Sequence, residues 1–153
     1  SIIAIPPPAT RLLMPGEEAT IMATRNHVPE GQSVVYSTTP PTSGDHWESW
    51  AECGFYESGL PDEFIVHNLE HGNVVVSYNF SEKQDIAALR RTLAGIDLAE
   101  EWGVTRFYDK IPEGTVAVTA WGMRARMPGS DLDGLASFFA AFAGEVGPER
   151  IAC

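Results

Sequence analysis

The sequence predicts a single compact α+β domain with a small mixed or antiparallel sheet, two main helices and a loop-rich N-terminal half. Short runs of β-branched and aromatic residues recur in the second half of the chain, where two further segments carry apolar residues at helical spacing. Most of the prolines lie in the first half. With 153 residues, of which 44% are hydrophobic, the chain is long enough to bury one core.

Residues 1–32 are predicted to form an extended N-terminal arm, and residues 33–153 the single folded domain. Prolines and glycines interrupt every periodic pattern in the arm, which leaves only a short strand around 19–23. Another short strand is expected over 33–37. The following run, 38–44, is too rich in proline, threonine and glycine for a helix or a central strand, so it predicts an ordered loop.

The second half of the chain alternates between strand and helix patterns. Strands are predicted over 64–66 and 73–78, on either side of a short histidine-containing segment. A helix is expected from Ser81, which begins a capping-box pattern, to Gly95, and its apolar stripe consists of Ile86, Leu89 and Leu93. The remaining predicted elements are a short helix over 97–103, strands over 104–108 and 115–121, and a closing helix that begins at Ser130.

The chain is strongly acidic. Ten Lys and Arg residues stand against 21 Asp and Glu residues, which gives a formal charge of −11. Such a surface repels phosphate backbones and anionic lipid, so we expect no nucleic-acid partner. No apolar run approaches the ~18 residues that a transmembrane helix needs, so any membrane anchor would lie in a segment absent from this chain.

The two cysteines, Cys53 and Cys153, are far apart in the sequence. Their spacing excludes a CxxC redox pair and a structural zinc motif. Two interpretations stay open at this point. A disulfide that closes so long a loop would stabilise the fold by roughly 4 to 5 kcal/mol, less any strain. The alternative is a pair of free thiols.

Three of the four histidines, His46, His67 and His71, are the main candidates for a functional site. Imidazole is the commonest metal ligand, and one helical turn would place residues 67 and 71 on the same face, about 5 to 6 Å apart at Cβ. Any one of these histidines taken alone would be better explained as a structural residue hydrogen-bonded to backbone. Three of them beside a rigid Pro-Pro loop favour metal binding.

The segment from His67 to His71 also matches HxxEH, a motif in which two histidines bind zinc and the glutamate acts as base. That motif belongs inside a long helix, whereas predicted strands flank it here. We therefore interpret Glu70 as a carboxylate that orients an imidazole or pairs with an arginine or backbone amides. We expect no catalytic residue, and a small metal-dependent hydrolase with Glu70 as general base is the third-ranked interpretation.

The type of metal depends on the donor atoms. Met123 and Met127 follow a predicted strand, and a thioether that joins imidazoles is a copper-like ligand set. Histidine with a carboxylate would suit zinc or iron instead. We expect a copper ion, with zinc as the alternative, held by His46, His67, His71 and Met123. Ordinary packing is the competing explanation for Met123.

Several short motifs, taken in order, resemble those of domain-of-unknown-function family 3105 over about residues 27–149. They are TPPTSGDH at 39–46, WA at 50–51, GFY at 54–56, VHNLEHG at 66–72, TAWG at 119–122 and GPE at 147–149. Asp45 departs from the family pattern where a proline is expected, and Cys53 departs where a bulky residue is expected. The second departure fits a disulfide with Cys153. The resemblance implies an exported bacterial protein that often carries an N-terminal signal or a single membrane anchor.

These observations together predict a periplasmic or extracellular copper-handling protein that stores, delivers or buffers the ion and does not turn over a substrate. The alternative is an accessory subunit of a membrane-anchored complex with structural histidines. In that case an aromatic region would dock to a protein partner, and its residues would be Trp47, Trp50, Phe55 and Tyr56.

Overall fold

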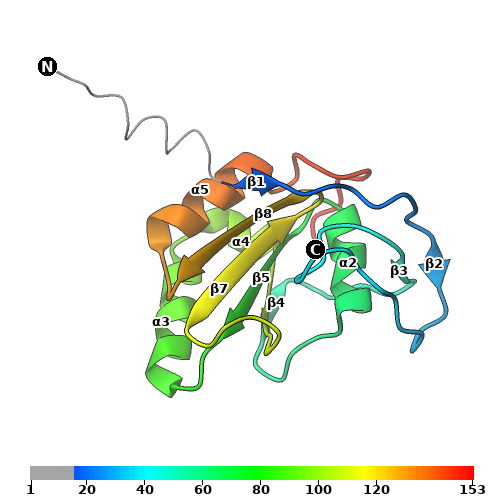
Figure 1. Cartoon of the computed structure of the whole chain (residues 1–153). Coiled ribbons are helices and arrows are strands. Elements are labelled where there is room, and N and C mark those ends of the chain that lie inside the picture. The colour runs from blue at the N-terminus through cyan, green and yellow to red at the C-terminus, as the bar shows by residue number, and fades with distance from the viewer. Residues whose placement is uncertain (1–15) are drawn as a thin grey trace, which may run out of the picture.

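A six-stranded mixed sheet organises the protein, which we describe from a computed structural model over residues 16–153 (Figure 1). The sheet has the order β1 (Glu17–Glu18), β8 (Met123–Pro128), β7 (Thr115–Ala120), β5 (Val74–Asn79), β6 (Gly103–Phe107) and β4 (Gly54–Tyr56). β6 pairs in parallel with both β4 and β5, and the other pairs are antiparallel. β2 (His27–Val28) and β3 (His46–Trp47) form a separate two-stranded parallel sheet. The predicted α+β class is confirmed.

Helices cover both faces of the large sheet (Figure 1). One face carries α2 (Asp62–Glu70), and the other carries α3 (Lys83–Ala94), α4 (Asp97–Trp102) and α5 (Leu132–Phe142). Strand β5 shows the division, because Val74 and Val76 pack in the core under α3 and α5 whereas Val75 packs against α2. A strand buried on both faces is apolar at successive positions, which explains the run of three valines.

The helix α2 replaces the strand that the sequence predicted over 64–66, so that prediction is wrong. The helix follows Pro61, and its first turn holds the acidic residues Asp62 and Glu63, which the helix dipole favours at this end. Ile65 and Leu69, one turn apart, are fully buried against the sheet. The helical spacing of the buried apolar residues therefore decides the structure of this segment, although residues 64–66 have high β propensity.

Other predicted elements agree more closely with the structure. The helices at 83–94, 97–102 and 132–142 lie within the expected segments, as does β7, and β5 and β6 are each shifted by one residue from the predicted ranges. Strand β8 was missed, and residues 33–37 form no strand. The described part of the predicted arm forms β1, which pairs with β8, and β2, which pairs with β3, in place of a strand at 19–23. Within residues 16–153, no helix is long and apolar enough to cross a membrane.

The N-terminal cap of α5 is Asp131, whose carboxylate accepts a hydrogen bond from the backbone amide of Gly134. The sequence predicted Ser130 for this role. We expect Asp131→Ala to lower the free energy of unfolding by about 1 kcal/mol, because it leaves a helix N–H group without its acceptor. Ser130→Ala is the matched control and should change it by less than about 0.5 kcal/mol. Urea denaturation of both variants measures this, and equal losses would contradict the assignment.

Candidate metal centre

The helix α2 places three polar side chains of the HxxEH segment beside one another. His67, Glu70 and His71 are spaced i, i+3 and i+4, so they project from one side of the helix. All three are buried, although each is polar. The rings of His67 and His71 lie 4.6 Å apart between centroids. Buried ionisable groups need partners, which makes this side of α2 the first place to look for a site.

Two more histidines reach this side of α2 through the small parallel sheet. In its register, His27 of β2 lies directly opposite His46 of β3. The ring centroid of His67 lies 4.7 Å from that of His46 and 5.0 Å from that of His27. His46 is fully buried, whereas His27 is exposed. His27 is not among the ligands predicted from the sequence, because no pattern within residues 24–30 indicates that β2 pairs with β3.

The loop before β3 holds the segment that carries His27. The Ser43 hydroxyl accepts a hydrogen bond from the Met22 amide at 2.8 Å. The Asp45 carboxylate accepts bonds from the Asn26 amide at 2.7 Å and from the Thr24 hydroxyl at 2.8 Å. Proline at position 45 would have no side-chain acceptor for these donors. The departure from the expected family pattern at this position therefore helps to place His27 beside His46.

Four donor atoms converge between β2, β3 and α2. They belong to His27, His46, His67 and Glu70, and all lie within 4.8 Å of one another. The Glu70 Oε1 atom is 3.2 Å from Nε2 of His46 and 4.0 Å from Nε2 of His67. Donors around a tetrahedral zinc ion are about 3.3 Å apart, given Zn–N bonds of about 2.0 Å. The His46–Glu70 pair is already at about that spacing, and no pair of the four donors is more than 4.8 Å apart.

Backbone carbonyls set the orientation of two of the imidazoles. Nδ1 of His46 lies 2.9 Å from the Gly44 carbonyl oxygen, and Nδ1 of His67 lies 2.8 Å from that of Trp47. A carbonyl only accepts, so each Nδ1 carries the proton and donates it. In the neutral ring, Nε2 then presents its lone pair toward Glu70. Metal-binding histidines are commonly held in this way by a backbone carbonyl on the other nitrogen.

The buried environment also favours neutral imidazole. The pKa of His67 is lowered from its ordinary value to about 4, mainly by burial and additionally by the neighbouring rings of His46 and His71. The hydrogen bond to Trp47 and the charge of Glu70 only partly oppose this change. Burial likewise lowers the pKa of His71, against the raising effect of Glu149. At neutral pH, both rings therefore carry a lone pair that can bind a metal.

Glu70 is shared between the histidines and an arginine. Its Oε2 atom accepts a hydrogen bond from Nη1 of Arg25 at 2.9 Å, while Oε1 faces the imidazoles. Arg25 is 53% exposed and compensates part of the buried carboxylate charge. The two carboxylate oxygens thus have separate partners, which fixes the direction in which Oε1 points.

The four histidine rings, with Glu70, form one cluster, and His71 lies at its edge, outside the group of four converging donors. Its Nε2 atom is 3.7 Å from Oε1 of Glu149. The Trp50 ring packs 5.1 Å from His67 and 5.0 Å from His71 between centroids, and Trp50 is 48% exposed. Of the sequence-predicted ligands, the structure brings His46 and His67 together, with His71 beside them.

Met123, the fourth predicted ligand, does not lie near the cluster. Its side chain packs on the core beneath α3 and α5, on the face of the sheet opposite α2. The predicted aromatic docking region is divided in a similar way. Phe55 packs on the core beneath α3, Tyr56 packs on the α2 side, and Trp50 covers the histidines. Phe55 and Tyr56 therefore lie on opposite faces of the sheet, and Trp47 packs against Phe64.

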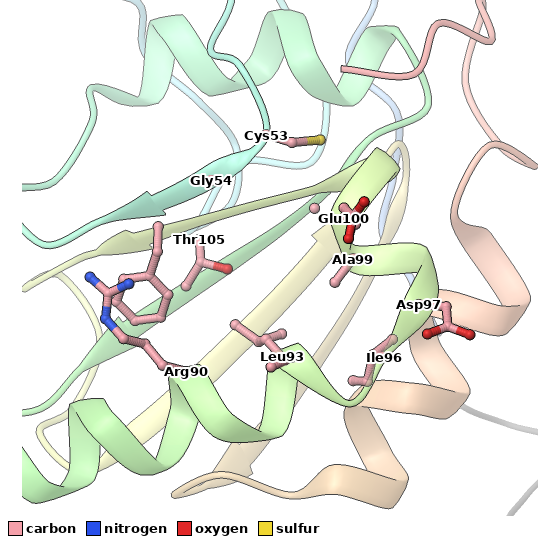
Figure 2. Close-up of a pocket in the computed structure, with 12 residues that line it drawn as sticks. Cys53, Gly54, Arg90, Leu93, Ile96, Asp97, Ala99, Glu100 and Thr105 are labelled. Carbon is pink, nitrogen blue, oxygen red and sulfur yellow. The ribbon is translucent and has the colours of Figure 1, made fainter.

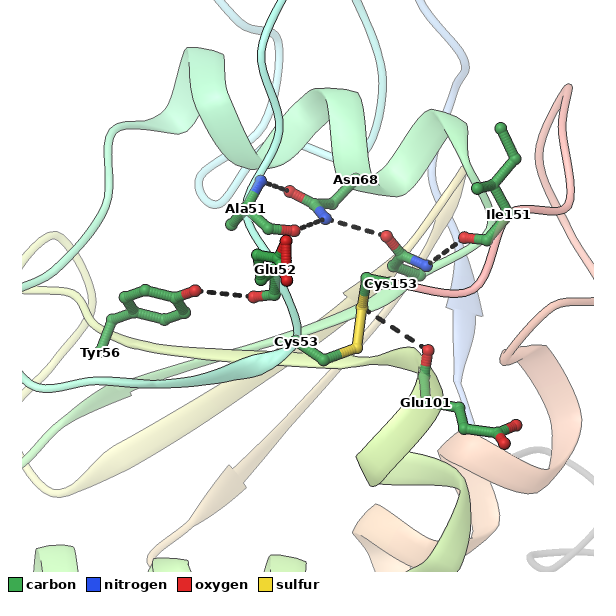
Figure 3. Close-up of a disulfide and its surroundings, with 9 residues drawn as sticks. Ala51, Glu52, Cys53, Tyr56, Asn68, Glu101, Ile151 and Cys153 are labelled. Carbon is green, nitrogen blue, oxygen red and sulfur yellow. Dashed lines mark hydrogen bonds between the residues drawn. A yellow bond between two sulfur atoms is a disulfide. The ribbon is translucent and has the colours of Figure 1, made fainter.

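A disulfide joins Cys53 to Cys153, which settles the open question about the thiols (Figure 3). It links the segment before β4 to the last residue of the chain. Nearby, the buried Asn68 amide bonds both backbone groups of Ala51 and the side chain of Asn73, and Asn73 bonds the Ile151 carbonyl. The end of the chain is thereby held against α2.

A cavity of about 330 Å³ lies at the edge of the sheet, between β4, β6, α3 and α4 (Figure 2). Cys53, Phe55 and Leu93 line it, with Arg90 at one end and Asp97 and Glu100 at the other. A second cavity of about 400 Å³ adjoins the N-terminus of α2 and includes Asp62 and Lys110. Neither cavity is lined by any of the four converging donors.

Comparison with known proteins shows a match to a protein family. The family model described as "Protein of unknown function (DUF3105)" matches residues 27–153, which is most of the chain and includes all four donors. No curated protein and no solved structure matches the sequence. The matched region begins at His27, so the histidine on β2 lies inside the family domain. The chain therefore belongs to the DUF3105 family of proteins of unknown function.

Proposed function

We propose that this protein binds one divalent transition-metal ion through His27, His46, His67 and Glu70, and that it stores, delivers or buffers that ion. Three imidazole nitrogens and a carboxylate oxygen are an ordinary donor set for such ions. The lowered pKa of His67 and the backbone carbonyls that orient the rings of His46 and His67 support the proposal.

One observation carries it. Nε2 of the fully buried His46 faces Oε1 of Glu70 at 3.2 Å, and that nitrogen has no hydrogen-bond partner among residues 16–153. With Nδ1 committed to Gly44, both facing atoms are acceptors when the ring is neutral. Two buried acceptors repel each other unless a cation lies between them. A metal ion that also engages His27 and His67 satisfies all four donors, whereas an added proton would satisfy only the pair.

The donors favour Cu²⁺ and Zn²⁺ over Cu⁺. Nitrogen and oxygen donors suit the divalent ions, and the thioether that would favour Cu⁺ lies on the other face of the sheet. A given nitrogen and oxygen site generally binds Cu²⁺ more tightly than Zn²⁺. We therefore propose that Cu²⁺ displaces Zn²⁺ in direct competition, and that copper remains the first candidate for the physiological ion.

Exchange of the ion, rather than turnover of a substrate, fits the surroundings of the site. His27 is exposed, so an ion can reach the donors from solvent. Neither of the two cavities described above is lined by the proposed ligands, so neither would hold a substrate beside the ion. The disulfide supports an exported protein, because disulfides persist mainly in oxidising compartments.

The proposal is tested by metal retention. The purified protein is loaded separately with Cu²⁺ and Zn²⁺, desalted, and assayed for bound metal by mass spectrometry. Wild-type protein should retain about one equivalent, and His67→Ala far less, because a site that loses one of four ligands binds weakly. Glu48→Gln, an exposed carboxylate outside the cluster, is the matched control for ions held loosely by the acidic surface.

Retention well below one equivalent by the wild type, or equal retention by His67→Ala, would exclude the proposal. An element-specific anomalous map of a crystal adds a positional test, since the ion should lie between His46 and Glu70. A crystal grown with metal that shows no peak there would favour a protonated, structural His46–Glu70 pair instead.

A further inference from the structure

We propose that the Cys53–Cys153 disulfide controls how tightly the ion is held, because it fastens the free end of the C-terminal strap, residues 144–153, whose backbone is hydrogen-bonded to the end of α2. This inference rests on the metal binding proposed above and concerns the regulation of the same site. The oxidised protein would be the tight-binding form, and the reduced protein the releasing form.

The C-terminal strap satisfies the free carbonyl groups at the end of α2. The Glu149 amide donates to the Glu70 carbonyl at 3.0 Å, the Ile151 amide to the His71 carbonyl at 2.8 Å, and the Gly144 amide to the Gly72 carbonyl at 2.9 Å. The last carbonyls of a helix have no partner within the helix itself. The strap therefore holds the backbone of Glu70, the residue that contributes the carboxylate donor.

A side chain of the C-terminal strap also reaches the cluster. Oε1 of Glu149 lies 3.7 Å from Nε2 of His71, whose ring packs against His67. A strap that moves away would thus remove both a backbone clamp on Glu70 and a carboxylate that positions His71. Ligands held by such supporting contacts lose affinity when the contacts are removed.

The disulfide is the covalent hold on the free end of the C-terminal strap. One end continues from α5 through Ala143, which is part of the core. The other end stops at Cys153, whose only backbone bond among those described is from its amide to the Glu101 carbonyl. In Figure 3 the disulfide ties this end to the chain beside Asn68 of α2. Breaking it would leave only non-covalent contacts, the hydrogen bonds and the packing of Val146, to hold the strap.

A reductant can reach the disulfide. Both cysteines are partly exposed, and Cys53 lines the open cavity shown in Figure 2. Reduction takes two electrons and two protons from a dithiol reductant, whose thiolate attacks one sulfur of the pair. The dithiol becomes a disulfide, and Cys53 and Cys153 become two thiols. This exchange between the dithiol and the disulfide needs no other reactant.

The test compares Zn²⁺ dissociation constants by competition with a chromophoric chelator. The oxidised wild type is compared with the double variant C53S/C153S, because serine releases the strap without adding thiolate ligands. The double variant should bind Zn²⁺ at least about fivefold more weakly, the lower end of typical coupling between sites. Hydrogen exchange should show faster exchange at Glu149 and Ile151 with unchanged protection in β5.

A second variant covers the case in which the double variant does not fold. Ile151→Pro keeps the disulfide and removes only the amide that donates to His71, so affinity should fall. Ala152→Pro is its matched control, because the Ala152 amide donates no backbone hydrogen bond within residues 16–153.

The outcomes separate the two proposals. If folded C53S/C153S and Ile151→Pro both bind Zn²⁺ within twofold of the wild type, control by the disulfide is excluded and metal binding stands. If the oxidised wild type itself binds no ion, the proposed function fails, and this inference fails with it.

Discussion

Replacing His27 with alanine is expected to weaken Zn²⁺ binding by at least about 100-fold, since losing even a residue that supports a ligand costs 10- to 100-fold. His27 is one of the four converging donors and lies opposite His46 in the parallel β2–β3 pair. Its side chain is exposed, so its removal leaves the core intact. Competition with a chromophoric chelator measures the dissociation constant.

The matched control is His71→Ala. This residue also lies in the histidine cluster, but it faces Glu149 and is not among the converging donors. Its loss should change the dissociation constant by less than about tenfold, the lower bound for a supporting residue. If His71→Ala instead abolished binding and His27→Ala had little effect, the histidine ligands would be the three predicted from the sequence, His46, His67 and His71.

The largest expected loss of stability follows from Asn68→Ala, about 3 to 5 kcal/mol in the free energy of unfolding. The Asn68 side chain is fully buried and accepts a bond from the Ala51 amide. It also donates to the Ala51 carbonyl and to Oδ1 of Asn73. Alanine would leave these three buried groups without the bonds shown, and each unsatisfied buried group costs about 1 to 3 kcal/mol. Urea denaturation of the metal-free protein measures the change.

Asn26→Ala is the control for this experiment. Asn26 is exposed, and only its backbone takes part in the hydrogen bonds described above. Its substitution should change the free energy of unfolding by less than about 0.5 kcal/mol. A loss below about 1.5 kcal/mol for Asn68→Ala would mean that water or a rearranged backbone replaces the missing bonds.

Much of the fold was predictable because its patterns are local. The apolar stripe of α3 and the β-branched run of β5 each reveal their element within a few residues. The β8 strand was also visible in principle, since Met123, Ala125 and Met127 alternate with two arginines. The prediction for α2 is wrong because Ile65 and Val66 favour a strand by intrinsic propensity, whereas the helical spacing of Ile65 and Leu69 decides the structure.

The site was predictable only in part, because it depends on long-range pairing. The HxxEH segment identified His67 and Glu70 as neighbours, and the proline loop pointed to His46. His27 joins them only through two residues of parallel pairing that no local pattern announces. Met123 is predicted as a ligand only because a thioether suits copper. The alternation of β8 places it on the core face beneath α5, which no argument from ligand softness could reveal.

The edges of the large sheet have a consequence for solubility. The two outermost strands are its shortest, with two residues in β1 and three in β4. A sheet recruits strands from other molecules through the unpaired backbone groups of its edges, and short edges present few of them. The three consecutive valines of β5, an aggregation-prone type of segment when exposed, lie in the interior of the sheet between paired neighbours. The order of the strands thus protects the protein from edge-to-edge association.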